Sequence, residues 1–175
     1  MKKTLITVAL LAAAASASAT TYDWGPHNAT AEANSAFVAA GSFSDVYTFS
    51  LSLDQQVASS VVSLNLSPVY SITGASYSLW LDKGVAGVGG GDEELGSWAF
   101  DGTTGSTSHT LNVASGNYYY LVTGTADGMG DGNGRAGFYT IASTVVPVPE
   151  PETYALMMAG LFVVGGAFAR RAKRS

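Results

Sequence analysis

The sequence of 175 residues contains no cysteine. This absence excludes disulfide bonds, cysteine catalysis, cysteine-ligated zinc and iron–sulfur clusters. Charged residues are also scarce, at 12% against roughly 25% in an ordinary soluble protein. Apolar residues reach 47%, which argues against intrinsic disorder and favours a β-rich chain or one that partly inserts into a membrane.

Basic residues are nearly missing from the central part of the chain. Between residues 20 and 149 only Lys83 and Arg135 are basic, against eleven acidic residues, so this stretch has a formal net charge of −9. A nucleic-acid-binding protein needs basic side chains to contact phosphates. The sequence therefore excludes nucleic acid as a partner.

The N-terminus has the three parts of a secretory signal peptide. Met1-Lys2-Lys3 is positively charged, residues 4–15 are apolar, and Ala17-Ser18-Ala19 has the A-x-A pattern of a cleavage site. This order predicts a signal peptide over residues 1–19 that passes the Sec translocon and is cut by signal peptidase after Ala19. A membrane-spanning helix is disfavoured because the apolar run is short.

A second apolar run covers residues 154–169 and contains no charge. As a helix it would be about 24 Å long, marginal against a bilayer core of about 30 Å. Four basic residues follow it: Arg170, Arg171, Lys173 and Arg174. Since basic flanks stay in the cytoplasm, the pattern predicts one C-terminal transmembrane helix with a basic stop-transfer tail, and the membrane as a partner.

Alternating prolines precede this run, from Pro147 to Glu152. Proline fixes φ and lacks an amide donor, so we expect an extended, exposed tether. The motif Pro149-Glu150-Pro151, followed by the apolar run and the Arg-rich end, resembles the PEP-CTERM sorting signal over residues 147–175. The resemblance implies processing by an exosortase near this motif. It also implies delivery to the surface of a Gram-negative bacterium that makes exopolysaccharide.

Short runs between residues 41 and 146 alternate between apolar and polar residues. The clearest run, residues 43–51, places Phe43, Asp45 and Tyr47 on one face. Gly-, Asp- and Ser-rich turns separate it from six further runs, at 57–66, 75–82, 95–101, 109–113, 117–125 and 135–145. About seven short strands predict an all-β fold, a small antiparallel β-sandwich. Residues 20–40, which are polar and Ala-rich, are expected to be weakly ordered.

The residues Phe43, Asp45 and Tyr47 also resemble the FxDxF motif of one PEP-CTERM subfamily, with tyrosine in place of the second phenylalanine. The resemblance carries no biochemical activity. Asp45 lies on the apolar face of its strand, where a carboxylate needs hydrogen bonds or a positive partner. It is interpreted either as a catalytic or metal-binding residue or, the favoured reading, as a structural residue that accepts backbone N–H groups or pairs with Arg135.

A Gly-rich acidic segment contains Asp127, Asp131 and Asn133, whose oxygen atoms suit calcium. The segment lacks the distant glutamate of an EF-hand loop, and a tight turn rich in Gly and Asp explains it without metal. Calcium is therefore a weak alternative, and we expect no cofactor.

Two aromatic residues, Trp80 and Tyr119, lie on the less apolar faces of their strands, where flat rings could stack on sugars. The alternative is that they pack at the edge of the core. The chain has no G-x-S-x-G motif, and its two histidines, His27 and His109, form no evident catalytic set. The sequence thus predicts a non-catalytic surface or matrix protein. The alternatives are a carbohydrate-binding module for exopolysaccharide, an uncleaved membrane-anchored protein, or an enzyme.

Overall fold

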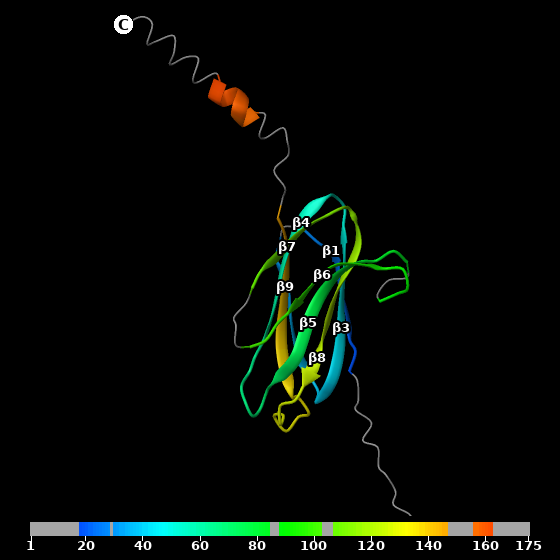
Figure 1. Cartoon of the computed structure of the whole chain (residues 1–175), viewed down its shortest axis with the longest axis vertical. Coiled ribbons are helices and arrows are strands. Elements are labelled where there is room, and N and C mark those ends of the chain that lie inside the picture. The colour runs from blue at the N-terminus through cyan, green and yellow to red at the C-terminus, as the bar shows by residue number, and fades with distance from the viewer. Residues whose placement is uncertain (1–17, 29, 85–87, 103–106, 147–155, 163–175) are drawn as a thin grey trace, which may run out of the picture.

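The computed structural model describes residues 18–28, 30–84, 88–102, 107–146 and 156–162. Its strands form two packed sheets (Figure 1). The five-stranded sheet has the order β1-β3-β8-β5-β6, and the four-stranded sheet has the order β2-β9-β4-β7. In chain order the strands are β1 (Thr21–Pro26), β2 (Glu32–Val38), β3 (Gly41–Leu51), β4 (Gln55–Ser63), β5 (Ile72–Leu81), β6 (Glu93–Ala99), β7 (His109–Val113), β8 (Gly116–Ala126) and β9 (Gly137–Val146).

The predicted all-β class is confirmed, but the described part of the chain contains nine strands instead of about seven. The two additional strands, β1 and β2, come from residues 20–40, so the expectation of weak order there is wrong. The sheets are also not wholly antiparallel, because β1 pairs with β3 in parallel. Distant partners define both strands: β1 lies beside β3, and β2 lies beside β9. Local alternation is a weak signal for strands stabilised in this way.

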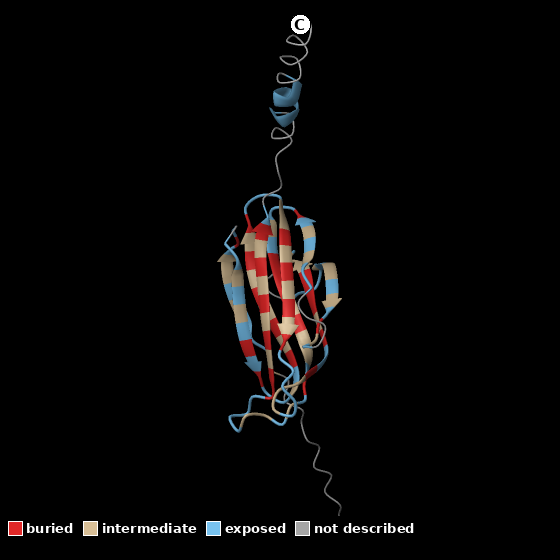
Figure 2. Ribbon diagram, turned by 90° about the vertical axis from the view of Figure 1, so that its left-hand side faces the viewer, coloured by how far each residue is buried: buried red, intermediate tan, exposed pale blue. Residues whose placement is uncertain are grey.

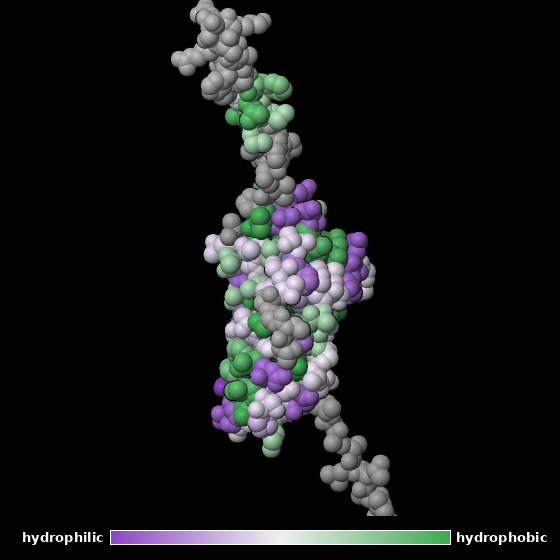
Figure 3. All heavy atoms as spheres, turned by 60° about the vertical axis from the view of Figure 1, so that its left-hand side comes forward, coloured by the Kyte–Doolittle hydropathy of each residue, from purple (hydrophilic) through white to green (hydrophobic). Residues whose placement is uncertain are grey.

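The predicted transmembrane helix over residues 154–169 is contradicted. In the described stretches of the chain, helical structure covers residues 156–162, a length of about 10 Å at 1.5 Å per residue. No helix in these stretches is long and apolar enough to cross a membrane. The apolar side chains of residues 156–162 are exposed and drawn in green in Figure 3.

The core lies between the two sheets and is rich in tyrosine. Figure 2 shows buried and less buried residues alternating along the central strands, as expected for strands with one face on a core. The face predicted for residues 43–51 is confirmed, because Phe43, Asp45, Tyr47, Phe49 and Leu51 are all buried. Opposite them, β8 pairs with the whole length of β3. This register places Asp45 in the interior, between β1 and β8.

Candidate functional site

Asp45 is an acidic residue enclosed in the core, with 2% of its surface exposed. Its Oδ1 accepts a hydrogen bond from the backbone N–H of Thr20 at 3.0 Å. Its Oδ2 accepts one from the Tyr139 hydroxyl at 2.6 Å. Within the described residues, none of the ion pairs includes Asp45. Asp45 is therefore held by neutral donors.

The predicted alternative of an Asp45–Arg135 pair is wrong. The guanidinium of Arg135 lies 3.8 Å from Asp131 Oδ2 and sits over the ring of Phe37, with 4.7 Å to the ring centroid. Arg135 precedes β9, where its side chain remains half-exposed. The other structural alternative, a backbone N–H donor to Asp45, agrees with the contact from Thr20.

Two tyrosines extend the Asp45 contacts into a chain of hydrogen bonds. The hydroxyls of Tyr47 and Tyr139 lie 2.7 Å apart, and Asn34 Nδ2 donates to the Tyr47 hydroxyl at 3.4 Å. Because Tyr139 donates to Asp45, Tyr47 must donate to Tyr139, and the chain runs in one direction from Asn34 to Asp45. We refer to these four residues as the Asp45 chain.

Burial keeps both tyrosines of the Asp45 chain protonated. Desolvation raises the pKa of Tyr47 to about 12. It also raises the pKa of Tyr139, and the neighbouring Tyr47 and Asp45 raise it further. Each hydroxyl therefore remains a donor at any physiological pH. Tyr22 stacks on Tyr47 with ring centroids 4.7 Å apart, and Phe43 stacks on Tyr139 at 5.5 Å, so rings cover the chain. The arrangement can fix strands together, and it offers a substrate no entrance.

The structure also brings together a histidine, a serine and a glutamate that the sequence gives no reason to connect. His27 Nε2 lies 2.9 Å from Ser143 Oγ, and His27 Nδ1 lies 3.4 Å from Glu32 Oε1. The order acid, histidine, serine is that of a hydrolase triad. However, Ser143 is 3% exposed, and its Oγ also contacts the Tyr120 hydroxyl at 3.0 Å. A substrate cannot reach Ser143 Oγ in this arrangement.

The acidic turn between β8 and β9 uses its oxygen atoms for internal hydrogen bonds. Asp131 accepts from the N–H of Asn133 at 2.9 Å and from the Tyr70 hydroxyl at 3.2 Å. Asp127 accepts from the Thr73 hydroxyl at 3.2 Å. In the described parts of the chain, no group of three or more His, Asp or Glu residues is arranged to hold a metal ion.

The two aromatic residues considered for sugar binding lie side by side on the outer face of the five-stranded sheet. The rings of Trp80 and Tyr119 are parallel, with centroids 6.1 Å apart. Tyr119 is only 1% exposed, and its hydroxyl donates to Asp92 Oδ2 at 3.0 Å. Its ring is therefore covered, whereas Trp80 is half-buried.

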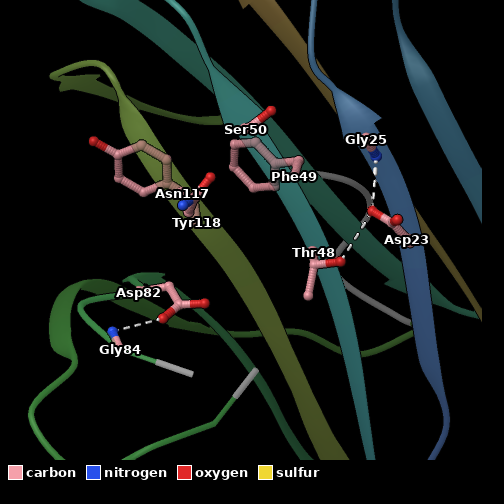
Figure 4. Close-up of a pocket in the computed structure, with 9 residues that line it drawn as sticks. All are labelled: Asp23, Gly25, Thr48, Phe49, Ser50, Asp82, Gly84, Asn117 and Tyr118. Carbon is pink, nitrogen blue, oxygen red and sulfur yellow. Dashed lines mark hydrogen bonds between the residues drawn. The ribbon is translucent and has the colours of Figure 1, made fainter. Parts of the chain in front are cut away.

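A pocket of about 310 Å³ opens at one end of the same sheet (Figure 4). Its polar lining consists of hydroxyl, amide and carboxylate groups from three strands and the segment after β5: Asp23, Thr48, Ser50, Asp82 and Asn117. Two lining residues, Phe49 and Tyr118, belong to the buried core. The pocket can donate and accept hydrogen bonds, and its two carboxylates disfavour an anionic ligand.

The remaining predicted site residues lie near or beyond the limits of the described chain. Ala19 is exposed and lies between Ser18, which forms a bridge to Phe43, and Thr20. Ala17 lies outside the described residues, as do the motif Pro149-Glu150-Pro151 and the basic residues 170–174.

Comparison with known proteins gives one family match. The PEP-CTERM protein-sorting motif matches residues 147–174. This match implies export to the cell surface and processing by an exosortase. No curated protein matches the sequence.

Several solved structures align with this chain at low identity. The pre-peptidase C-terminal domain of collagenase from Bacillus anthracis aligns over 71% of this chain and 94% of its own, with 17% identity and a TM-score of 0.44. PliG from Aeromonas hydrophila, a periplasmic inhibitor of g-type lysozyme, aligns over 75% and 100%, with 12% identity and a TM-score of 0.43. The surface-associated copper-binding protein CorA from Methylomicrobium album BG8 aligns over 73% and 100%, with 12% identity and a TM-score of 0.39.

Proposed function

We propose that this chain is a non-catalytic component of the cell surface or extracellular matrix, associated with exopolysaccharide and cut by an exosortase near Pro149-Glu150-Pro151. The observation that carries the proposal is the match of the sorting motif to residues 147–174. The fold is compatible with a cut there, because β9 ends at Val146. Assignment to the FxDxF subfamily is part of the proposal, and the inward positions of Phe43, Asp45 and Tyr47 support it.

A non-catalytic role is supported by where the reactive groups lie. The arrangement of His27, Ser143 and Glu32 is the nearest to a catalytic set in the described residues, and its serine is buried. The carboxylate of Asp45 is likewise enclosed by aromatic rings. We infer that these groups stabilise the sandwich.

The test is the intact mass of the native protein in membrane and extracellular fractions of its host. We expect the extracellular form to lack residues 1–19 and the residues beyond about position 150. In a strain without the exosortase, the C-terminal residues should remain. A matched variant replaces all three residues of Pro149-Glu150-Pro151 with alanine and should also retain them. If the extracellular protein of the unmodified host kept its C-terminal residues, the sorting proposal would be wrong.

A second candidate function is carbohydrate binding, and the pocket in Figure 4 favours it. Hydroxyl, amide and carboxylate groups that converge on one pocket suit the hydroxyl groups of a neutral sugar. The half-buried Trp80 adds a ring on the outer face of the same sheet. We therefore propose sugar contacts at the Asn117 end of β8 and at Trp80, and not at Tyr119, whose ring is covered.

Retention on the host's insoluble exopolysaccharide tests this candidate. We expect Asn117→Ala and Trp80→Ala each to reduce retention. Met129→Ala, which changes a highly exposed residue in the turn between β8 and β9, should leave it unchanged. If Asn117→Ala and Trp80→Ala were retained as well as Met129→Ala and the unmodified protein, this site would be rejected.

A further inference from the structure

The enclosed carboxylate of Asp45 is the feature of the core that most needs an explanation. A buried carboxylate is costly unless a positive group or several hydrogen bonds compensate it. Asp45 has two donors, and both are neutral as the chain stands before processing. One of these donors, the backbone nitrogen of Thr20, belongs to the residue that follows the predicted signal-peptide cut.

The position of Thr20 depends on the residues that follow it. Its carbonyl oxygen accepts a hydrogen bond from the N–H of Val46 at 2.8 Å, and Thr21 pairs with Val46 in the parallel ladder. These contacts remain when residues 1–19 are removed. The nitrogen of Thr20 lies 3.0 Å from Asp45 Oδ1 while Ala19 precedes it, and these contacts would hold it there after the cut.

We propose that cleavage after Ala19 turns the Thr20 nitrogen into an α-ammonium group that pairs with Asp45, so that the new N-terminus supplies the missing cation of the buried site. Water adds across the Ala19–Thr20 peptide bond. The carbonyl carbon of Ala19 gains the hydroxyl group and the nitrogen of Thr20 gains the hydrogen atom. The new carboxylic acid then releases its proton and the new amine takes one up, which leaves a carboxylate on Ala19 and an ammonium group on Thr20. An α-amino group has a pKa near 8, so it is mostly charged at neutral pH. The proposal rests on the predicted signal-peptide cut and is independent of C-terminal sorting.

The geometry favours this pair over an ordinary buried ion pair. Thr20 is exposed, so its ammonium group can direct one N–H to Asp45 and the others to water. The cation therefore keeps most of its hydration, which removes much of the usual cost of burying a charge. A charge-assisted hydrogen bond is stronger than the neutral one that it replaces.

The cut also removes an alternative contact of the precursor. Before cleavage, Ser18 donates to the carbonyl of Ser42 at 3.1 Å and accepts from the N–H of Ser44 at 2.8 Å. These bonds lengthen the parallel ladder past the scissile bond. A signal peptidase can bind that segment only while this end of β1 is released from β3. The mature chain exchanges two backbone hydrogen bonds for one ion pair.

The test uses the whole processed chain, residues 20–175, carrying Lys83→Arg and Lys173→Arg. In this background Thr20 holds the only amine. Three forms are compared by denaturant unfolding: the free amine, the Nα-dimethyl form, which keeps the charge, and the Nα-acetyl form, which keeps the N–H donor but loses the charge. We expect acetylation to raise the unfolding equilibrium constant roughly tenfold and dimethylation to change it little. Identical midpoints for the free and acetylated forms would overturn the proposal.

Two matched controls identify Asp45 as the partner. A chain that begins at Ala19 moves the charge by about one residue, roughly 3.3 Å, so its acetylation should have no effect. In Asp45→Asn, acetylation at Thr20 should also have no effect. If Asp45→Asn does not fold, the chain that begins at Ala19 still shows whether Asp45 is the partner of the Thr20 ammonium group. An effect of acetylation that is equal in the chains beginning at Thr20 and Ala19 would mean that Asp45 is not the partner. Neither result depends on whether an exosortase cuts the C-terminal side.

Discussion

The interior of this sandwich is specified by polar atoms as well as by apolar packing. Tyr47 stands where the FxDxF motif, which this segment resembles, has its second phenylalanine. Its hydroxyl has two hydrogen-bond partners, Asn34 and Tyr139. The extra oxygen is therefore accommodated by a hydrogen bond, and the ring still stacks on Tyr22. A single hydroxyl here links strands from both sheets, because Tyr47 lies on β3 and Tyr139 lies on β9.

The order of the Asp45 chain predicts unequal effects of removing its hydroxyls. Tyr139→Phe leaves Asp45 Oδ2 without the donor at 2.6 Å and should cost about 2–3 kcal/mol of unfolding free energy, because a buried carboxylate loses its partner. Tyr47→Phe leaves the Asp45 contact intact and should cost about 1 kcal/mol. Denaturant unfolding measures both. Equal costs, or the reverse order, would show that the chain does not converge on Asp45.

Gly128 predicts a second effect of a single residue. A Cβ built there would lie 2.3 Å from the carbonyl oxygen of Ala136 and 2.4 Å from that of Val69. Backbone atoms on both sides cannot yield cheaply, so Gly128→Ala should lower the unfolding free energy by several kcal/mol, about 2–4. Gly90→Ala is the matched control, because a Cβ at Gly90 meets nothing within 4 Å. A small, equal loss in both variants would reject the predicted clash.

Among the elements, the connection between β5 and β6 is organised by one carboxylate. Asp92 accepts hydrogen bonds from the N–H groups of Lys83 at 3.0 Å and Gly89 at 2.7 Å, and from the Tyr119 hydroxyl. The two backbone donors are the main cause that lowers the pKa of Asp92 below its ordinary value of 3.8. These bonds hold Asp92 against the Tyr119 hydroxyl, whose ring also stacks on Trp80.

The lowered pKa of Asp92 predicts that the folded protein loses stability in acid. Because the pKa of Asp92 is lower in the folded state, its stabilising effect is complete above about pH 4 and is lost as the pH falls below 3.8 through the folded-state value. Melting temperatures between pH 7 and pH 2 should fall less steeply in Asp92→Asn than in the unmodified protein. Glu94→Gln, which neutralises an exposed carboxylate of β6, should leave the slope unchanged. An unchanged slope in Asp92→Asn would contradict the assignment.

At the scale of the whole molecule, the folded body and the sorting segment are separate in sequence. The last strand ends at Val146, and the sorting match begins at residue 147. The described residues beyond this point, 156–162, are all exposed. The sandwich therefore needs no described contact from the C-terminal side.

This separation predicts that a cut near the Pro-Glu-Pro motif leaves stability unchanged. A chain that ends at residue 150 should unfold at the same denaturant midpoint as the chain that ends at residue 175. As a control, ending the chain at residue 142 removes the end of β9 that pairs with Ala58 and Val57 on β4 and should be strongly destabilising. A lower midpoint for the chain ending at residue 150 would mean that the sorting segment stabilises the body.

Most strands could be predicted from the sequence, because period-2 alternation records one buried face. Residues 43–51 show this best, since every second residue there is buried. The same rule failed for β1, whose residues alternate only between exposed and half-buried. Alternation of apolar residues also gives no sign of a serine that faces inward, as at Ser59, Ser63 and Ser143. The contacts of such a residue can come from distant parts of the chain: Ser143 Oγ lies 2.9 Å from His27 Nε2 and 3.0 Å from the Tyr120 hydroxyl.

The candidate sites were less predictable for a related reason. The sequence indicated that Asp45 needs a partner, but its donors, Thr20 and Tyr139, lie 25 and 94 residues away. Parallel pairing of β1 brings the first donor, and the packing of the two sheets brings the second. Such contacts depend on the order of the strands and on the packing of the sheets, and a local sequence pattern does not reveal either.

The central place of β9 has a mechanical consequence. This strand lies between β2 and β4 and is antiparallel to both. Drag on a surface protein held through its C-terminal side would enter the fold at Val146 and pull along β9. The load would act as shear on both ladders at once, so their hydrogen bonds would have to break together instead of one after another. A strand at the edge of the sheet, pulled along its own axis, would be held by one such ladder instead of two.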